Sequence, residues 1–213
     1  MNFAKDRWNI GCRVGAWVAV SGLVAVNLAA FSSVLAAEAG DTVLLIAKRQ
    51  LQHPLYGASI LIAKPIGNGQ HIGFILNKPT SVKLRDALPA DDSSRKVYDP
   101  LYLGGPFNVT NIFALVNRAD SPGRGSIEIA DDIHLAIDTD TVKRIIAVEP
   151  ERARFFFGAV LWRPGELDSE LERGLWHVRE PDPELVLRKQ TQGLWEDLVR
   201  RAEQEAYLRS HGI

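Results

Sequence analysis

The chain has 213 residues, of which 46% are hydrophobic, with a net charge of −1 and a single cysteine. A chain of this length can form one domain with a sizeable core, so neither a disulfide nor a metal is needed to hold it together. A surface that binds phosphates normally carries a basic excess, so the net charge does not support nucleic-acid binding. Because Cys12 is the only cysteine, an internal disulfide is excluded.

Residues 1–39 have the organisation of an export leader. Lys5, Arg7 and Arg13 precede the uncharged apolar run Val14–Ala37, which small residues close. These are the parts of a secretory signal peptide, but the run is also nearly long enough to span a bilayer as an uncleaved anchor. Either alternative places the rest of the chain in the periplasm or anchored to the inner membrane and facing it. A misassigned start codon, the third alternative, would leave a cytoplasmic protein.

Residues 41–210 are predicted to form one domain that begins with short strands. Apolar runs rich in β-branched residues predict strands, and the Asn-Gly step in Gly67–Gly69 predicts a hairpin because it tolerates positive φ. Ser81 is expected to cap a short helix that stops at Pro89. The first half of the domain is predicted to contain strands Thr42–Ala47, Ala58–Ala63, His71–Leu76, Leu101–Leu103 and Ile112–Val116, with a polar loop over Asp91–Asp99.

The second half of the domain is predicted to mix strands with helices in no regular alternation. Asp140 is expected to cap a helix that ends before Pro150, and Pro164 suits the first turn of another. Further predicted elements are strands Ser126–Ala130, Ile133–Ile137, Ala153–Trp162 and Leu175–Val178, with Ala153–Trp162 central, and a terminal helix over Thr191–Leu208. Irregular order of this kind favours an α+β domain over a doubly wound sheet.

No catalytic, metal or cofactor site can be recognised in this sequence. None of the five histidines forms the His-x-x-x-His pair that places two imidazoles on one helical face for zinc, and no Gly-x-Ser-x-Gly nucleophile elbow occurs. No cofactor is expected. His53, in a loop beside Pro54, is the residue on which a hydrolase with a site assembled from distant residues would depend.

Several segments, in a fixed order, resemble the YqgE/AlgH family of bacterial proteins. The resemblance covers about residues 42–202 and rests on Leu44–Ala47, Gly73–Pro79, Leu103–Pro106, Phe157–Leu167 and Leu175–Trp176. It implies an α+β fold with a small mixed or antiparallel, partly barrel-like sheet surrounded by helices. Family members are often labelled transcriptional regulators, a label that implies no mechanism and no agreed catalytic residues. Family members usually lack a leader, unlike this chain.

Two glycine- and proline-containing segments at strand ends are the candidate ligand site. Asn77 and Lys78 precede Pro79, and Gly104 and Gly105 precede Pro106. Glycines leave backbone amides approachable, and a nest of such amides can bind a carboxylate or phosphate. The four residues Asn77, Lys78, Gly104 and Gly105 are therefore predicted to bind a small anionic ligand. The alternative is that glycine and proline only make the turns.

Three functions are compatible with these observations. The leading hypothesis is a non-catalytic binding or regulatory domain in the cell envelope, whose partner is an unknown protein or a small anionic ligand and whose only membrane contact is the N-terminal segment. The second is a cytoplasmic transcriptional regulator, because an exported domain cannot reach DNA. The third is a hydrolase that depends on His53 and a carboxylate.

Overall fold

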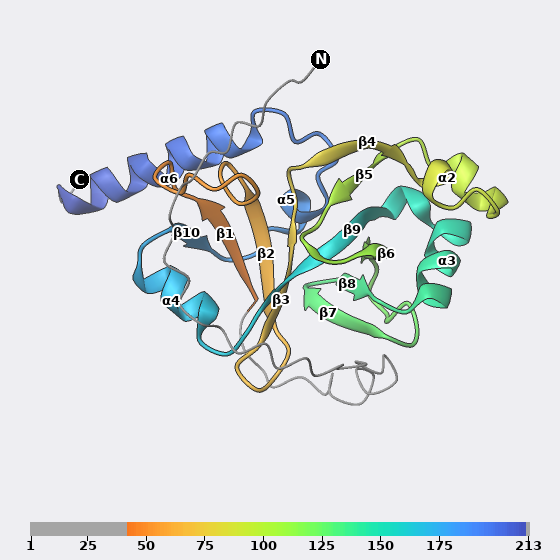
Figure 1. Ribbon diagram of the computed structural model, residues 1–213. Coiled ribbons are helices and arrows are strands. Elements are labelled where there is room, and N and C mark those ends of the chain that lie inside the picture. The colour runs from red at the N-terminus through yellow and green to blue at the C-terminus, as the bar shows by residue number, and fades with distance from the viewer. Residues whose placement is uncertain (1–41, 212–213) are drawn as a thin grey trace, which may run out of the picture.

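In the part of the chain that the structure describes, the strands join into one ten-stranded sheet of mixed direction, most of whose pairs are antiparallel. The structure is a computed structural model that describes residues 42–211. Figure 1 shows the sheet curling into a partly closed barrel with helices around it, which confirms the predicted α+β fold. The strands are β1 (Val43–Ala47), β2 (Ile60–Pro65), β3 (His71–Ile75), β4 (Pro79–Lys83), β5 (Pro100–Leu103), β6 (Phe107–Asn117), β7 (Ser126–Ala130), β8 (Ile133–Ala136), β9 (Ala153–Trp162) and β10 (Trp176–Arg179).

Strand β9 is central, as its apolar sequence predicted. Its first half pairs antiparallel with β6 and, on the other side, parallel with β5, while its last residues pair with β3. From β3 the sheet continues through β2 and β1 to β10, and from β6 through β8 to β7. Strands β10 and β7 are therefore the two ends of the main path of the sheet.

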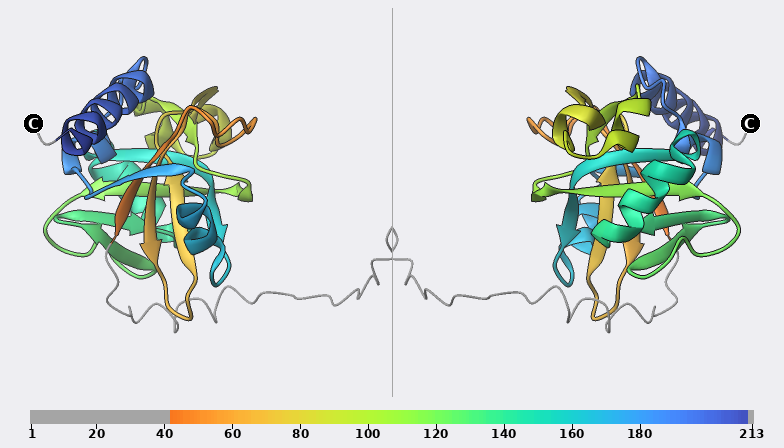
Figure 2. Two further views of the ribbon diagram at one scale, coloured as in Figure 1. Left: turned by 90° about the vertical axis from the view of Figure 1, so that its left-hand side faces the viewer. Right: turned by 90° about the vertical axis from the view of Figure 1, so that its right-hand side faces the viewer.

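The helices cover the sides of the sheet and fill its interior. They are α2 (Leu84–Ala87), α3 (Thr139–Val148), α4 (Glu166–Glu172), α5 (Pro183–Leu187) and α6 (Leu194–Ser210), with 3₁₀ turns η1 (Asp92–Lys96) and η2 (Pro150–Arg152). Helix α6 lies over β1, where the Trp195 indole N–H donates to the Ala47 carbonyl at 2.8 Å. Figure 2 shows α6 on one side of the sheet and α2 with α3 on another.

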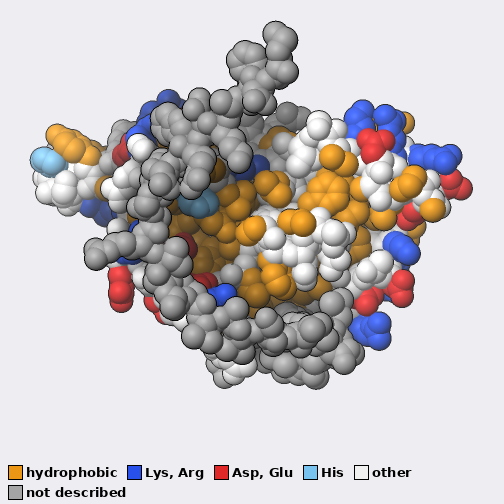
Figure 3. Space-filling model, viewed as in Figure 1, with side chains coloured by type: hydrophobic (Ala, Val, Ile, Leu, Met, Phe, Trp, Pro, Cys, Tyr) orange, Lys and Arg blue, Asp and Glu red, His pale blue; other side chains and the backbone are white. Residues whose placement is uncertain are grey.

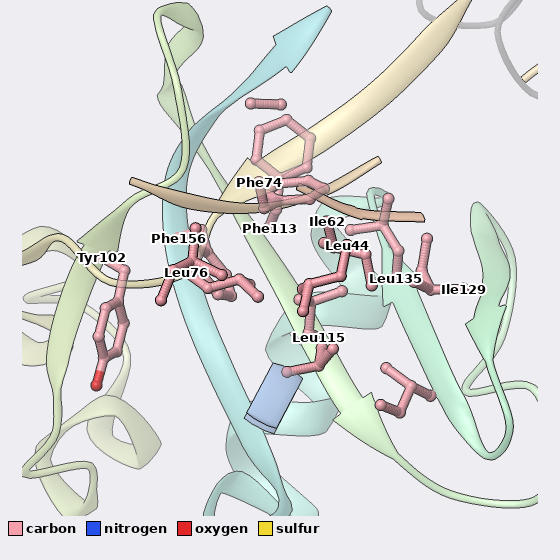
Figure 4. Packing of buried hydrophobic residues seen from close by; sticks show 14 of the residues in the cluster. Leu44, Ile62, Phe74, Leu76, Tyr102, Phe113, Leu115, Ile129, Leu135 and Phe156 are labelled. Atoms are coloured by element: carbon pink, nitrogen blue, oxygen red, sulfur yellow. The ribbon is translucent and has the colours of Figure 1, made fainter. Parts of the chain in front are cut away.

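The core lies inside the curl of the sheet and is mostly apolar. Phe74, Phe113 and Phe156 pack there with ring centroids 5.4 to 5.5 Å apart, between strands distant in sequence (Figure 4). Leu185 and Val186 of α5 belong to the same cluster, so this short helix fills the interior. Burial of apolar area of this kind is the main stabilising term in folding.

Three local predictions of helix starts were wrong. Ser81 does not cap a helix but lies in β4, because pairing with β5 overrides its capping preference. Asp138, not Asp140, is the N-cap of α3; the Thr141 N–H that donates to its carboxylate lowers the pKa of Asp138. Pro164 lies just before α4, whose N-cap is Gly165.

The remaining differences concern helices and one strand length. Helix α5 and the turn η1 were not predicted, because each is too short to show helical periodicity. Strand β6 begins at Phe107 and not at Ile112 as predicted, and its pairing with β9 shifts in register between these two residues.

The proposed leader, residues 1–39, lies outside the described residues. Within residues 42–211, the structure contains no helix with the length and apolar character needed to span a bilayer.

Candidate functional site

The structure brings together the four residues of the predicted ligand site, where β3 and β5 end. The Leu103 N–H donates to the Lys78 carbonyl at 2.9 Å, and the Ile75 N–H donates to the Gly104 carbonyl at 2.8 Å. The segments around Asn77–Lys78 and Gly104–Gly105, about 27 residues apart in sequence, are thus joined by backbone hydrogen bonds.

The Asn77 carboxamide is held by the backbone before β2. Its Oδ1 accepts the Ile60 N–H at 2.9 Å, and its Nδ2 donates to the Ala58 carbonyl at 2.9 Å. Ala58 has a positive φ of 52°, a strained conformation for a residue with a Cβ. The Asn77 side chain therefore stabilises an irregular entry into β2 and uses one acceptor and one donor to do so.

The two glycines allow backbone segments to approach closely. Both are buried, and the Gly104 N–H donates to the Phe157 carbonyl at 2.8 Å. A Cβ on Gly105 would lie 2.3 Å from the carbonyl carbon and oxygen of Ala159, and one on Gly158 would lie 2.4 Å from the Gly105 carbonyl oxygen. This packing requires glycine at these positions. Ligand binding by Asn77, Lys78, Gly104 and Gly105 stays a prediction.

Lys78 is the charged residue of this cluster, and its ammonium group would attract an anion. Its side chain is partly buried, and this burial lowers the pKa of its ammonium group. Among residues 42–211 it forms no ion pair.

Arg154 is a buried cation next to this cluster that the sequence-based prediction missed. It is 2% exposed, stacks with its guanidinium carbon 4.0 Å from the Tyr102 ring centroid, and donates to the carbonyls of Leu76 and Val186. Burial lowers the pKa of Arg154 to about 10, which leaves it charged at neutral pH. A charged residue inside the apolar run Ala153–Trp162 was the signal that could have identified it.

Two of its guanidinium hydrogen bonds give Arg154 a structural role. They join the end of β3 to the end of α5, and both acceptors are neutral carbonyls. The Nε of Arg154 has no hydrogen-bond partner in the described part of the chain. The side chain is too deeply buried to meet a ligand.

His53, the residue required by the hydrolase hypothesis, stabilises a turn. Its Nδ1 accepts the N–H groups of Leu55 and Tyr56 at 3.1 and 3.2 Å, and its ring stacks on Tyr56 at 4.9 Å between centroids. Across residues 42–211, no three His, Cys, Asp or Glu side chains gather into an arrangement that could hold a metal ion.

A larger hollow lies between the two ends of the sheet. Its volume is about 770 Å³, within the range of ligand sites in proteins. We call it the edge groove, and it is lined by Thr42, Val43, Lys64, Glu128–Asp131, Val178–Pro181 and Pro183. At one point the Thr42 hydroxyl bridges it by donating to the Ile129 carbonyl of β7.

The edge groove follows the edge of β7 on one side and the ends of the neighbouring strands β10, β1 and β2 on the other. Successive side chains of a strand point to opposite faces, so a hollow lined by the four consecutive residues Glu128–Asp131 follows the edge of β7. Val178–Pro181, at the end of β10, are also consecutive, and Val43 of β1 and Lys64 of β2 line the groove beside them. In the described sheet β7 pairs only with β8, and β10 only with β1. Each strand therefore has one unpaired edge in the described sheet.

The charges along the edge groove are mostly negative. Glu128, Asp131 and Glu180 are exposed, and none has an ion-pair partner among residues 42–211. Arg179 forms an ion pair with Glu205, with nitrogen and oxygen 2.5 Å apart. Lys64 is therefore the positive charge in the lining that is left to balance the three carboxylates. No sequence signal could have identified this site, because its walls are about 50 residues apart in the chain.

A family model described as AlgH-like matches residues 44–207. A UPF0301 protein from Chlorobaculum tepidum is 29% identical to this chain over 160 residues, which are 74% of this chain and 83% of that protein. A UPF0301 protein from Cytophaga hutchinsonii is 25% identical over 160 residues, covering 74% of this chain and 86% of its own length.

Two solved structures share the fold. The solution structure of the AlgH protein from Pseudomonas aeruginosa aligns with a TM-score of 0.61 and 19% identity, covering 81% of this chain and 88% of that one. The crystal structure of protein DIP2367 from Corynebacterium diphtheriae gives a TM-score of 0.62 and 21% identity, covering 81% and 92% of the two chains. Likeness at this identity concerns the fold alone.

Proposed function

The chain belongs to the AlgH-like family, as its resemblance to YqgE/AlgH proteins predicted, and we propose that its domain is a non-catalytic module that binds an extended segment of a partner protein in the edge groove. The observation that supports this proposal is the groove itself, a hollow of about 770 Å³ lined by residues of β7 and β10, each of which has one unpaired edge in the described sheet. An extended peptide can pair with such an edge through its main-chain hydrogen bonds.

The charge of the groove specifies the kind of segment. Three exposed carboxylates, on Glu128, Asp131 and Glu180, face a single lysine, Lys64, in the lining. Complementary charge favours encounter and fixes register, so the bound segment carries basic side chains. Because side chains alternate along a strand, these basic residues recur at every second position.

Reversing the groove charge is expected to weaken binding of a basic extended peptide. The probe is a synthetic peptide of alternating valine and lysine with blocked ends. The triple variant Glu128→Lys, Asp131→Lys, Glu180→Lys should bind it at least about tenfold more weakly in calorimetric titration, equivalent to about 1.4 kcal/mol. The three side chains are exposed, so the fold should be unaffected.

The matched control reverses an exposed carboxylate elsewhere. Glu172 ends α4, outside the groove lining, and Glu172→Lys should leave the affinity within about twofold. A probe with N-methylated alternate amides tests the edge pairing, because it keeps the charge and loses N–H donors. Equal affinity for the methylated and unmethylated probes would exclude β-edge pairing, and equal affinity of the triple variant and the wild type would exclude the groove.

We also propose that the domain works in the cell envelope, on the basis of Lys5, Arg7 and Arg13 followed by the apolar run Val14–Ala37. Fractionation with N-terminal sequencing should recover the protein from the periplasm with its first residue near Ala39. A membrane-bound protein that retains Met1 would indicate an anchor. A cytoplasmic protein that starts near Asp41 would contradict export and favour gene regulation, the label that family members often carry.

A further inference from the structure

A second hollow lies at the end of the molecule that carries α2 and α3. Its volume is about 280 Å³, and we call it the helix pocket. It is lined by Val82, Ala87, Leu88, Thr110, Asn111, Ile112, Thr139, Val142, Lys143 and Phe157. Figure 3 shows hydrophobic side chains reaching the surface among charged ones at this end. It shares no lining residue with the edge groove.

The walls of the helix pocket are apolar and incompletely covered. Val82, Ala87, Leu88, Ile112 and Phe157 are only partly buried, and all five pack against the buried cluster under α3. Their remaining apolar surface faces one concavity and is not scattered over the molecule. Covering such surface stabilises a complex by roughly 25 cal/mol for each Å² removed from water.

The rim of the helix pocket is polar and carries one charge. Thr139 and Lys143 lie four residues apart on α3 and so on the same helical face. Lys143 is exposed, has no ion pair within residues 42–211, and meets no carboxylate in the lining. The charged rim and apolar walls match a molecule with an anionic head and an apolar body.

Strand β6 is irregular where it forms part of this rim. Its register with β9 shifts between Phe107 and Ile112, and Asn108 has a positive φ of 51°. Bulges of this kind redirect side chains and are frequent beside functional sites. Thr110 and Asn111 lie in this irregular part of β6 and line the pocket, where their side chains can form hydrogen bonds with the head group of a ligand.

We propose that the helix pocket binds a small amphiphilic carboxylate, with its aliphatic chain against Val82, Leu88, Ile112 and Phe157 and its carboxylate at Lys143. The volume of the pocket is slightly below the usual range of ligand sites, so it suits a medium-length chain and not a membrane lipid.

The test is an NMR titration of the full domain with octanoate and with octanol. Octanoate should bind saturably and shift the amides of Leu88, Ile112 and Val142. Lys143→Glu should weaken octanoate binding about tenfold, because it turns attraction into repulsion, and should change octanol binding less than about twofold. The exposed position of Lys143 keeps the variant folded.

Two further variants complete the experiment. Ala87→Phe places a larger side chain in the partly covered wall and should weaken both probes at least about fivefold, while Arg201→Glu, on the exposed side of α6, should change neither. Amide shifts outside the pocket, an equal effect of Lys143→Glu on both probes, or unchanged affinity in Ala87→Phe would each overturn the proposal.

Discussion

Replacing Gly105 by alanine is expected to lower the free energy of unfolding by about 3 kcal/mol or more. The new Cβ would lie 2.3 Å from the Ala159 carbonyl carbon and oxygen and 2.5 Å from the Val160 nitrogen. These are backbone atoms of the central strand β9, so no rotamer change can relieve the contact. The loss would be a large part of the stability of an ordinary domain. Denaturant unfolding measures it.

Gly67→Ala is the matched control for this substitution. Gly67, unlike Gly105, has a positive φ, 89°, that favours glycine, but a Cβ there meets nothing within 4 Å. The expected loss is therefore about 1 kcal/mol, from backbone strain alone. If Gly105→Ala instead kept its stability and lost the binding of a small anion such as phosphate, the close-packing account would be wrong and the predicted ligand site would gain support.

Arg154→Ala is expected to lower the free energy of unfolding by about 3 kcal/mol. The change removes donors from the carbonyls of Leu76 and Val186, and each buried acceptor left unpaired costs about 1–3 kcal/mol. It also leaves a cavity beside Tyr102. Relief of the buried charge offsets part of this loss, because burial already holds the pKa of Arg154 at about 10.

Two comparisons give this prediction its specificity. Arg154→Lys should have a free energy of unfolding between those of the wild type and Arg154→Ala, because an ammonium group cannot donate to both carbonyls in the geometry of the guanidinium. Arg173→Ala, at an exposed arginine after α4, should change stability by less than about 0.5 kcal/mol. Wild-type stability in Arg154→Ala would show that the guanidinium does not join β3 to α5.

Much of the fold could be predicted because the sequence signals were local. The apolar run Ala153–Trp162 identified the central strand, and Gly67–Gly69 identified the turn between β2 and β3. Predictions were wrong where long-range pairing decided the outcome, as at Ser81, which lies in β4 because β5 pairs with that strand. Helix α5 is short and held by the core, so no periodicity could indicate it.

The candidate sites were much less predictable than the fold. The sequence correctly indicated that Asn77–Lys78 and Gly104–Gly105 lie at strand ends, and the structure joins them. It could not show that Gly105 packs against Ala159, because that contact depends on the curl of the sheet. The edge groove depends on the same curl, which brings Glu128 of β7 near Arg179 of β10.

Amide hydrogen exchange with the alternating valine–lysine peptide tests the edge groove most directly. The account predicts slower exchange of outward-facing N–H groups within residues 126–131 and 176–181 when the peptide is bound, because they gain strand-pairing hydrogen bonds. Saturation with the peptide while exchange in both segments stays unchanged would contradict the proposal that this domain binds extended partners at its open strand edges.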